Sequence, residues 1–365
     1  MRQAVGNSGV AIVTGASGQD GFFLARRLLR EGWDVHAVAR REPELDRIPE
    51  SPEQRGRFFP HRLDILDAAG ITQLIASTKP HEIYNLAGQS SVSISFAEPA
   101  ETWRTNAEAV RLLLEAVRHE APLARLYQSS SGEMFGWDAS AKRVHDEGSP
   151  LAPNSPYAAA KAAAHVLCAT YRRVLGVRVA CGIAFNHESH RRSSHFLTRR
   201  VVEHVRRIRT SGSGRVGSIP LAVGNLRAER DWGYAPDYVD GMIAVLRQVR
   251  TRSDVRGDPL PEADIAENYR DYVLATGNLH AVWQLIDQAF SLVGIGLSWE
   301  MDSDDVKDWR ACYSDSGAIA VTVDPSLLRP SDPVAISANP SLARRELGWR
   351  PRGLDQILKD MLEHA

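Results

Sequence analysis

Tyr157 and Lys161 are the two residues whose types and spacing most directly suggest catalysis. They lie four residues apart in the segment SPYAAAKAAAH, in which Ser155 and Pro156 make a good helix start. Residues four apart share one face of a helix, so the lysine charge can lower the pKa of the tyrosine. The phenolate could then take a proton from a substrate hydroxyl. The strand expected before this helix ends in three serines, and the last, Ser131, brings a hydroxyl to the same place.

A glycine-rich turn precedes this pair in the chain. The segment GASGQDG fits G-x-x-G-x-x-G between a predicted strand and a predicted helix. Glycine permits the tight turn and lets a pyrophosphate approach the backbone, and the N–H groups at a helix start hold phosphates. In this context the pattern predicts dinucleotide binding. The residues expected to contact the cofactor here are Gly15, Ser17, Gly18, Gln19, Asp20 and Gly21.

The end of the second predicted strand indicates which nicotinamide cofactor binds. An acidic residue there would hold the ribose 2′-hydroxyl of NAD, whereas arginine accommodates the 2′-phosphate of NADP. This chain has Arg40 and Arg41 at that place, and a guanidinium suits a phosphate better than a hydroxyl. The sequence therefore favours NADP. Asp64 is a candidate acceptor for the adenine amino group, with Ile65 beside it.

Short apolar segments rich in β-branched residues alternate with helical patterns in the first half of the chain. This alternation predicts a parallel sheet covered on both faces, and right-handed crossovers make it a doubly wound (Rossmann) α/β fold. A smaller, mixed C-terminal lobe would bind the substrate. The cofactor domain is expected over 8–188 with a later contribution from about 220–250, and the substrate lobe over 189–365. The strand candidates are 10–15, 35–40, 82–88, 125–130 and 179–185.

The second half is less regular. Helices are predicted over 236–250 and 281–293 and a strand over 272–276. The segments 210–218 and 251–268 have the composition of surface loops.

Composition excludes several classes of protein. The formal net charge of −1 gives no reason to expect nucleic acid or an anionic membrane as a partner. No apolar run is long enough to span a bilayer, and the first residues lack the features of a signal peptide. The three cysteines are widely spaced and form neither a disulfide pattern nor a metal motif. We therefore expect a cytoplasmic protein with no metal at its catalytic site.

Several longer stretches resemble the GDP-mannose 4,6-dehydratase family of extended short-chain dehydrogenase/reductases. They cover nearly the whole chain and occur in the family's order. NHES-x-RR and GNL-x-A-x-RDWG are the most specific. The stretches are TGASGQDG, NLAGQSSVSISFAEP, YQSSSGEMFG, SPYAAAK, GIAFNHESHRR, VGNLRAERDWGYAPDYV, YVLATG, LRPSD and ARRELGWRP.

The resemblance implies a nucleotide-sugar substrate, with a GDP-sugar favoured, and a homodimer or homotetramer. It implies that Tyr157 starts oxidation at sugar C4, that Lys161 holds the nicotinamide ribose, and that Ser131 binds the 4-oxygen. Glu133 would remove the C5 proton. Further cofactor contacts implied are Leu86, Ala87, Gln89, Ser90, His187 and Arg192. Substrate contacts implied are Ser91, Glu133, Asn186, Arg230, Arg329 and Asp332.

The chain departs from the family pattern at four places. Gly132 stands where the family usually carries serine, a side chain that would help to protonate the departing hydroxyl. Glu101 replaces a cofactor-contacting tyrosine, and Asp332 replaces a glutamate. Glu42 and Pro43 follow the arginine pair where small hydroxyl residues usually help to build a tetramer. The exact sugar and the oligomeric state therefore stay open.

Two other functions share most of these residues. A nucleotide-sugar epimerase or 4-keto reductase would use the same cofactor residues and the same serine, tyrosine and lysine. Glu133 argues against both, and Gly132 argues weakly for them. A catalytically silent NADP-binding regulator could lose Tyr157 or Lys161, whereas this chain keeps both.

Overall fold

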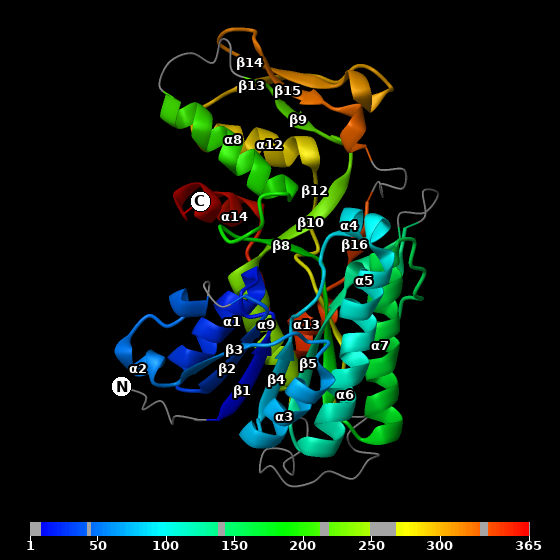
Figure 1. Ribbon diagram of the computed structural model, residues 1–365. Helices are drawn as coiled ribbons and strands as arrows, with labels where there is room; N and C mark the ends of the chain where they lie inside the picture. Colours follow the sequence, from blue (N-terminus) through cyan, green and yellow to red (C-terminus); the bar gives the residue numbers. More distant parts are fainter. Residues whose placement is uncertain are drawn as a thin grey trace.

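A sheet of seven parallel strands forms the base of the molecule (Figure 1). The computed structural model describes residues 9–41, 45–137, 143–211, 219–248, 268–328 and 335–364. The strand order is β11-β7-β5-β4-β1-β2-β3. The strands up to β3 lie to one side of β1 and the later strands lie to the other, so the strand order reverses between β1 and β4. The strands are β1 (Val10–Thr14), β2 (Asp34–Ala39), β3 (Phe58–Arg62), β4 (Glu82–Asn85), β5 (Arg125–Ser131), β7 (Val179–Ala184) and β11 (Tyr272–Leu274).

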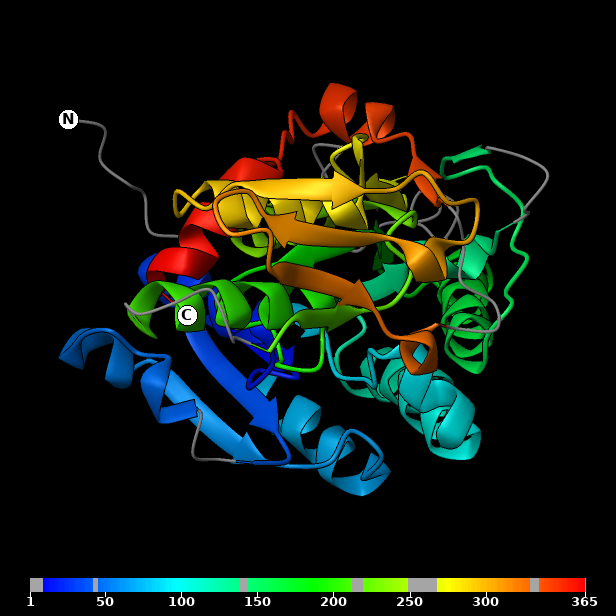
Figure 2. The ribbon, with the colours of Figure 1, turned by 90° about the horizontal axis from the view of Figure 1, so that it is seen from above.

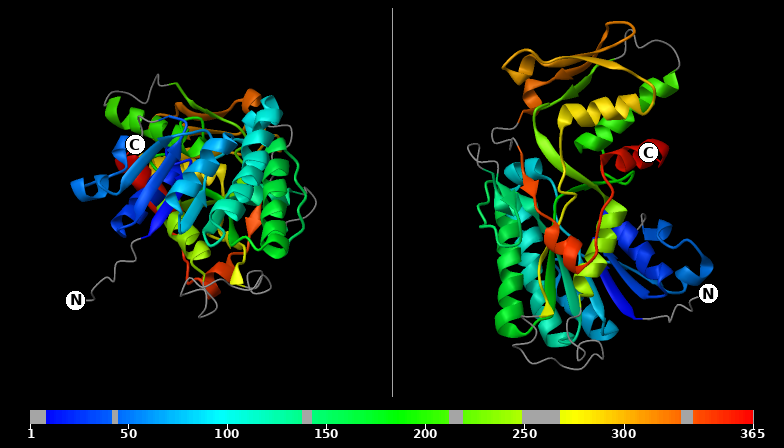
Figure 3. Two further views of the ribbon diagram at one scale, coloured as in Figure 1. Left: turned by 60° about the horizontal axis from the view of Figure 1, so that its bottom comes forward. Right: turned by 180° about the vertical axis from the view of Figure 1, so that it is seen from behind.

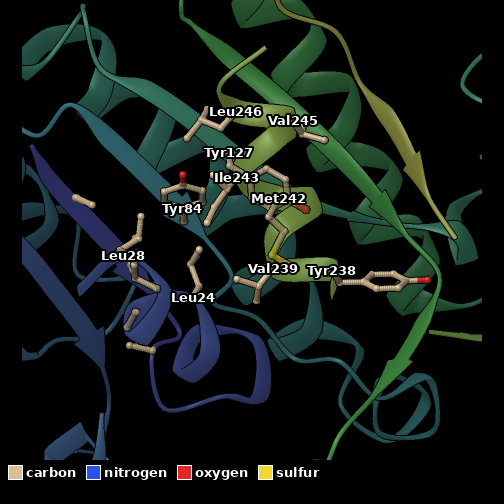
Figure 4. Close-up of a cluster of buried hydrophobic side chains, with 14 of the residues drawn as sticks. Leu24, Leu28, Tyr84, Tyr127, Tyr238, Val239, Met242, Ile243, Val245 and Leu246 are labelled. Atoms are coloured by element: carbon tan, nitrogen blue, oxygen red, sulfur yellow. The ribbon is translucent and has the colours of Figure 1, made fainter. Parts of the chain in front are cut away.

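Helices cover both faces of this sheet. One face packs against α1 (Gln19–Arg30), α9 (Ala235–Leu246) and α13 (Ser341–Glu346). Figure 4 shows this core, where Leu24 and Leu28 of α1 lie across from Met242 and Ile243 of α9. The other face packs against α3 (Ala68–Thr78), α6 (Ala109–Glu120) and α7 (Pro156–Leu175). Shorter helices are α2 (Pro52–Arg55), α4 (Val92–Ala97) and α5 (Pro99–Trp103).

A second lobe has its own sheet and its own hydrophobic core. Its strand order is β13-β14-β15-β9, and only the β15/β9 pair is parallel. Three helices lie beneath this sheet, which Figure 2 shows from above. The strands are β13 (Leu297–Glu300), β14 (Arg310–Tyr313), β15 (Ile319–Val323) and β9 (Leu221–Val223); the helices are α8 (Leu197–Ser211), α12 (Val282–Ser291) and α14 (Leu354–His364).

A three-stranded sheet runs between the two lobes, as the view from behind in Figure 3 shows. It consists of β8 (Asn186–Glu188), β10 (Glu229–Tyr234) and β12 (Leu279–Ala281). A small pair of strands, β6 (Val144–His145) and β16 (Ser337–Ala338), lies beside it. The segments expected to carry catalytic and substrate groups therefore meet where the lobes join.

The structure confirms the doubly wound α/β fold, with three differences in detail. The strand list drawn from the sequence omitted β3, because FFPHR contains a proline and does not alternate cleanly between apolar and polar residues. The helix predicted over 236–250 ends at Leu246. Thr210 and Ser211, predicted as loop, complete α8. Most of the two predicted loops, 212–218 and 251–267, lies outside the described residues.

None of the described helices is both long enough and apolar enough to cross a membrane.

A buried carboxylate at the start of β4 joins the end of α9 to the large sheet. Glu82 at the start of β4 is fully buried and accepts two hydrogen bonds from Arg247, at 2.8 and 2.9 Å. Arg125 and the hydroxyl of Tyr84 also donate to it, at 3.0 and 2.9 Å. Because Arg247 directly follows α9, this ion pair joins a late segment of the chain to the first half of the fold.

We expect Arg247→Met to lower the free energy of unfolding by about 3 kcal/mol, because it leaves a buried carboxylate short of a partner. Arg27→Met is the matched control, because Arg27 of α1 forms an exposed ion pair with Asp240 of α9 at 3.0 Å. The control should cost less than about 1 kcal/mol. Urea unfolding measures both, and equal losses would contradict a special role for the buried pair.

Candidate active site

The predicted site residues gather at the carboxyl edge of the large sheet. Because all seven strands run in the same direction, the segments that follow them lie along one edge. The glycine turn follows β1, the arginine pair follows β2, and Ser131 is the last residue of β5. In open α/β sheets, ligands bind at this edge near the point where the strand order reverses.

The turn after β1 requires glycine for two physical reasons. Gly15 has a φ of +69°, and a Cβ there would lie 2.8 Å from the backbone nitrogen of Ala87. A Cβ on Gly21 would lie 2.3 Å from the carbonyl oxygen of Gly15. Gly18 is the N-cap of α1 and offers no side chain to the helix start. The turn therefore presents backbone N–H groups of the kind that bind phosphate.

Gln19 and Asp20 connect the start of α1 to the segment around β8. Nε2 of Gln19 donates to the carbonyl oxygen of His187 at 3.0 Å, and its Oε1 accepts from Ser189 at 2.9 Å. Asp20 pairs with Nε2 of His187 at 2.9 Å. Burial acts to lower the pKa of His187, but the charge and hydrogen bond of Asp20, together with the hydrogen bond to the Phe185 carbonyl oxygen, raise that pKa overall. These predicted cofactor residues thus hold one another in place.

Ser131, Tyr157 and Lys161 converge at the end of β5. The Ser131 side chain lies close enough to the Tyr157 hydroxyl to act on the pKa of that phenol. Nζ of Lys161 lies 5.9 Å from the centre of the Tyr157 ring and donates to the carbonyl oxygen of Ser129 at 3.0 Å. Ser131, Tyr157 and Lys161 are each 8% exposed. As predicted, Ser155 is the N-cap of the helix, and its side chain accepts from the backbone N–H of Ala158.

Burial dominates the acid–base state of this group. It raises the pKa of Tyr157 to about 12, although the Ser131 side chain acts in the opposite direction. It lowers the pKa of Lys161 to about 8. The expectation that Lys161 would lower the phenol pKa is therefore wrong for this structure, because desolvation of the phenolate is the larger effect. The charge of Glu133 also raises the Tyr157 pKa.

A chain of buried polar groups joins the glycine turn to the lysine. The Thr14 hydroxyl donates to Oδ1 of Asn85 at 2.6 Å, and Nδ2 of Asn85 donates to Oε1 of Gln128 at 2.7 Å. Nε2 of Gln128 donates to the Ser129 carbonyl at 2.9 Å, which is the same oxygen that holds Lys161. Sequence reasoning missed this chain. The available signal was a polar side chain able to accept a hydrogen bond in each of β1, β4 and β5.

A cavity at the junction of the lobes brings together residues from both. It contains two predicted catalytic residues, Ser131 and Glu133, and two predicted substrate residues, Asn186 and Arg230. Nη1 of Arg230 donates to the carbonyl oxygen of Glu229 at 2.8 Å. The cavity is lined by Ser131, Gly132, Glu133, Ala184, Phe185, Asn186, Arg230, Asp231 and Ile336.

The loop after β4 holds a further group of predicted residues. The backbone N–H groups of Leu86 and Ala87 both donate to the Thr14 hydroxyl at 3.2 Å. The Gln89 side chain binds the backbone of Ser91, whose own hydroxyl caps α4. Ser90 is exposed. This loop therefore lies against the glycine turn, whereas Ser91 is outside the residues that line the cavity.

The remaining predicted residues lie around this centre. Arg40 and Arg41 are exposed beyond the end of β2. Asp64 accepts from the backbone N–H of Leu66 at 2.9 Å, and Ile65 is buried. Arg192 pairs with Glu188 at 3.0 Å. Arg329 and Asp332 lie outside the described residues.

Phe185 explains why position 132 is glycine in this chain. A Cβ on Gly132 would lie 2.7 Å from Cε2 and Cζ of the Phe185 ring, which is too close without movement. The ring is 7% exposed and packs with Met134 and Ile183. The aromatic ring therefore fills the space that a serine at position 132 would need.

Comparison with known proteins agrees with this arrangement. The family model described as GDP-mannose 4,6 dehydratase matches residues 12–258 and 263–361. The chain belongs to this family. A GDP-mannose 4,6-dehydratase of Sinorhizobium fredii is 35% identical, and the match covers 93% of this chain and 92% of that protein.

Two solved structures share the fold of this chain. One is UDP-glucose 4-epimerase of Thermotoga maritima with UDP-glucose, at a TM-score of 0.75 and 19% identity, covering 97% of this chain and 98% of that one. The other is RMD from Pseudomonas aeruginosa complexed with NADPH, at a TM-score of 0.71 and 20% identity, covering 98% of each chain.

We expect Gly132→Ser, which restores the residue usual in the family, to destabilise this protein by about 1–3 kcal/mol through overpacking against Phe185. The test is a double-mutant cycle with Phe185→Leu, which frees the space. Gly132→Ser should cost less in the Phe185→Leu background than in the wild type. Strictly additive losses would show that the ring does not restrict position 132.

Proposed function

We propose that this protein is an NADP-dependent nucleotide-sugar 4,6-dehydratase that acts on GDP-mannose or a related GDP-sugar. One observation carries the proposal: Glu133 lines the same cavity as Ser131 and is close enough to Tyr157 to affect the pKa of its phenol. A carboxylate beside the residues that handle the 4-oxygen is what elimination across C5 and C6 requires. Membership of the GDP-mannose 4,6-dehydratase family supports the same function.

The residues at the carboxyl edge fit a dinucleotide. Glycine at positions 15 and 21 lets the turn pack tightly against its own backbone, because a Cβ at either position would clash with main-chain atoms, and a tight glycine turn of this kind lets a pyrophosphate approach the helix start. Arg40 and Arg41 are exposed where a ribose 2′-phosphate would lie, and Lys161 would hold the nicotinamide ribose. When bound, the nicotinamide would supply a hydride acceptor for sugar C4 and a hydride donor for C6.

Each catalytic residue then has a defined role. Burial raises the pKa of Tyr157 to about 12, so its phenol must first ionise. The phenolate then takes the proton of the C4 hydroxyl as hydride leaves that carbon, and Ser131 donates a hydrogen bond to the resulting carbonyl oxygen. The carbonyl makes the C5 proton acidic, and the Glu133 carboxylate removes it. The C6 hydroxyl departs as water after receiving a proton from Glu133 or from a water that Glu133 holds, since Gly132 has no side chain to supply one. Return of the hydride to C6 and of a solvent proton to C5 would complete the 4-keto-6-deoxy sugar, so the sequence is redox-neutral overall.

The three-stranded sheet between the lobes would complete the substrate site. We propose that Asn186 and Arg230, which line the cavity, face the nucleotide and its diphosphate. Ser91, Arg329 and Asp332 are proposed to join them. We also propose that the protein is cytoplasmic and that it acts as a homodimer or homotetramer.

The direct experiment incubates the protein with GDP-mannose and NADP⁺ and follows the sugar by mass spectrometry. A dehydratase forms a product lighter by one water, with no net accumulation of NADPH. A parallel screen of UDP-, CDP- and dTDP-sugars identifies the preferred nucleotide. A product of unchanged mass would favour an epimerase and contradict the proposal.

Glu133→Gln and Tyr157→Phe should block different steps. Tyr157→Phe should lower turnover by a factor on the order of 10² or more, because the positioned acid–base group is lost. It should also suppress the absorbance of reduced cofactor at single turnover. Glu133→Gln should still show that transient absorbance and yet release no 6-deoxy sugar. Near-wild-type product formation by Glu133→Gln would remove this residue from the mechanism.

The arginine pair should determine the preference for NADP over NAD. Charge-assisted phosphate bonds contribute roughly 1.5–3 kcal/mol each, so we expect a preference of about tenfold or more. Arg40→Ala/Arg41→Ala should bind both cofactors with similar affinity, as measured by fluorescence titration. Arg57→Ala is a suitable control, because Arg57 is exposed just before β3 and pairs instead with Asp34. A preference unchanged in the double variant would refute the assignment.

A further inference from the structure

Three side chains with metal-binding atoms meet between α14 and the segment that follows β8. His190 lies in the segment that leads from β8 to α8, whereas Asp360 and His364 lie one turn apart on α14. Nδ1 of His190 is 3.0 Å from Oδ2 of Asp360, and Nδ1 of His364 is 3.5 Å from Oδ1 of Asp360. One ligand atom from each residue lies within 4.8 Å of the other two.

These separations are close to those that a metal ion imposes. Zinc bonds of about 2.0–2.1 Å in a tetrahedral shell place neighbouring ligand atoms about 3.3 Å apart. The spacing of Asp360 and His364 puts both side chains on one face of the helix, so two of the three ligands are positioned by the backbone of α14. Two imidazoles and one carboxylate form a ligand set that divalent transition metals prefer.

Neighbouring groups hold this cluster in position. The hydroxyl of Tyr234 donates to Oδ1 of Asp360 at 2.8 Å, and Nη1 of Arg199 donates to the carbonyl oxygen of His190 at 2.6 Å. The ring of Phe23 packs edge-on against His190 at a centroid distance of 5.6 Å. Outer contacts of this kind orient metal ligands. Nδ1 of His364 also lies 3.0 Å from the backbone carbonyl oxygen of Asp360.

The cluster is open to solvent and its local charge permits a cation. The side chains of His190 and His364 are 26% and 57% exposed, while that of Asp360 is 10% exposed. Arg352 lies over the Tyr234 ring, but its guanidinium is paired with both carboxylate oxygens of Asp237. An ion therefore has an entry path and meets the Asp360 carboxylate.

The described residues contain one other group of this kind, and its chemistry is different. His165, Cys181 and Asp271 also lie close together. Both carboxylate oxygens of Asp271, however, accept from Arg172, at 2.7 and 2.8 Å. A guanidinium already neutralises that carboxylate, so the group does not offer a cation site.

We propose that His190, Asp360 and His364 bind a divalent transition-metal ion such as Zn²⁺, with water completing its shell. In the register of the junction sheet, Tyr234 lies opposite Glu188, so the residue that orients Asp360 lies on the strand beside β8. The ion fixes α14 of the second lobe to the segment that carries His187 and Arg192. Its role is to stabilise the junction of the lobes, independently of the dehydratase chemistry.

The test uses untagged full-length protein, stripped with a chelator and titrated with Co²⁺ near pH 7.5. Binding should produce visible absorption bands of Co²⁺ at one equivalent, and Zn²⁺ should displace them. His190→Ala and His364→Ala should each weaken binding at least tenfold, and Tyr234→Phe should weaken it by about 10–100-fold as an outer-shell change. Zn²⁺ should also raise the midpoint of thermal unfolding of the wild type but not of His364→Ala.

His61→Ala is the matched control. His61 contacts His36 at 2.9 Å in a histidine pair that lacks an intervening carboxylate. This variant should keep the full Co²⁺ signal and the Zn²⁺-dependent stabilisation. The proposal is overturned if Co²⁺ binds no more tightly to the wild type than to the His190→Ala/His364→Ala variant, or if His61→Ala removes the signal.

Discussion

The arrangement of the candidate site depends on the buried hydrogen bond between the Lys161 ammonium and the Ser129 carbonyl oxygen. That oxygen also ends the polar chain that runs through Gln128 and Asn85 to Thr14. Thr14 in turn binds the backbone of the loop after β4, beside the glycine turn. In a buried network of this kind each group is costly to leave unpaired. The glycine turn and Lys161 are therefore held in register by interactions within the sheet.

The same burial sets the chemistry of the catalytic group. It makes the phenol of Tyr157 a weaker acid and the ammonium of Lys161 a stronger one, so their pKa values of about 12 and about 8 lie further apart than the ordinary values of 10.0 and 10.5. Phe185 adds a second constraint, because its ring leaves room only for glycine at position 132. Glu133 is left as the ionisable side chain that this turn contributes to the cavity.

Much of the fold and the centre of the site could be predicted from local sequence. The glycine turn, the five strands first proposed and the helix that begins at Pro156 each have a short-range signal. The role of Asn85 and Gln128 could not be predicted, because their partners lie on neighbouring strands 71 and 43 residues away in sequence. Glycine at position 132 is explained by the ring of Phe185, which directly follows β7 and is distant in sequence. The lowered pKa of Lys161 arises from burial in the folded protein. The assignment of the second lobe to substrate binding stays a prediction.

The central claim is that one site oxidises C4, eliminates water and reduces C6 of the same sugar. GDP-mannose labelled with deuterium at C4 tests it directly, with unlabelled NADP⁺ and product analysis by NMR. We predict that the 4-keto-6-deoxy product carries the deuterium on its C6 methyl group. Recovery of the deuterium at C4 of an epimerised sugar, or in the reduced cofactor pool, would contradict the account.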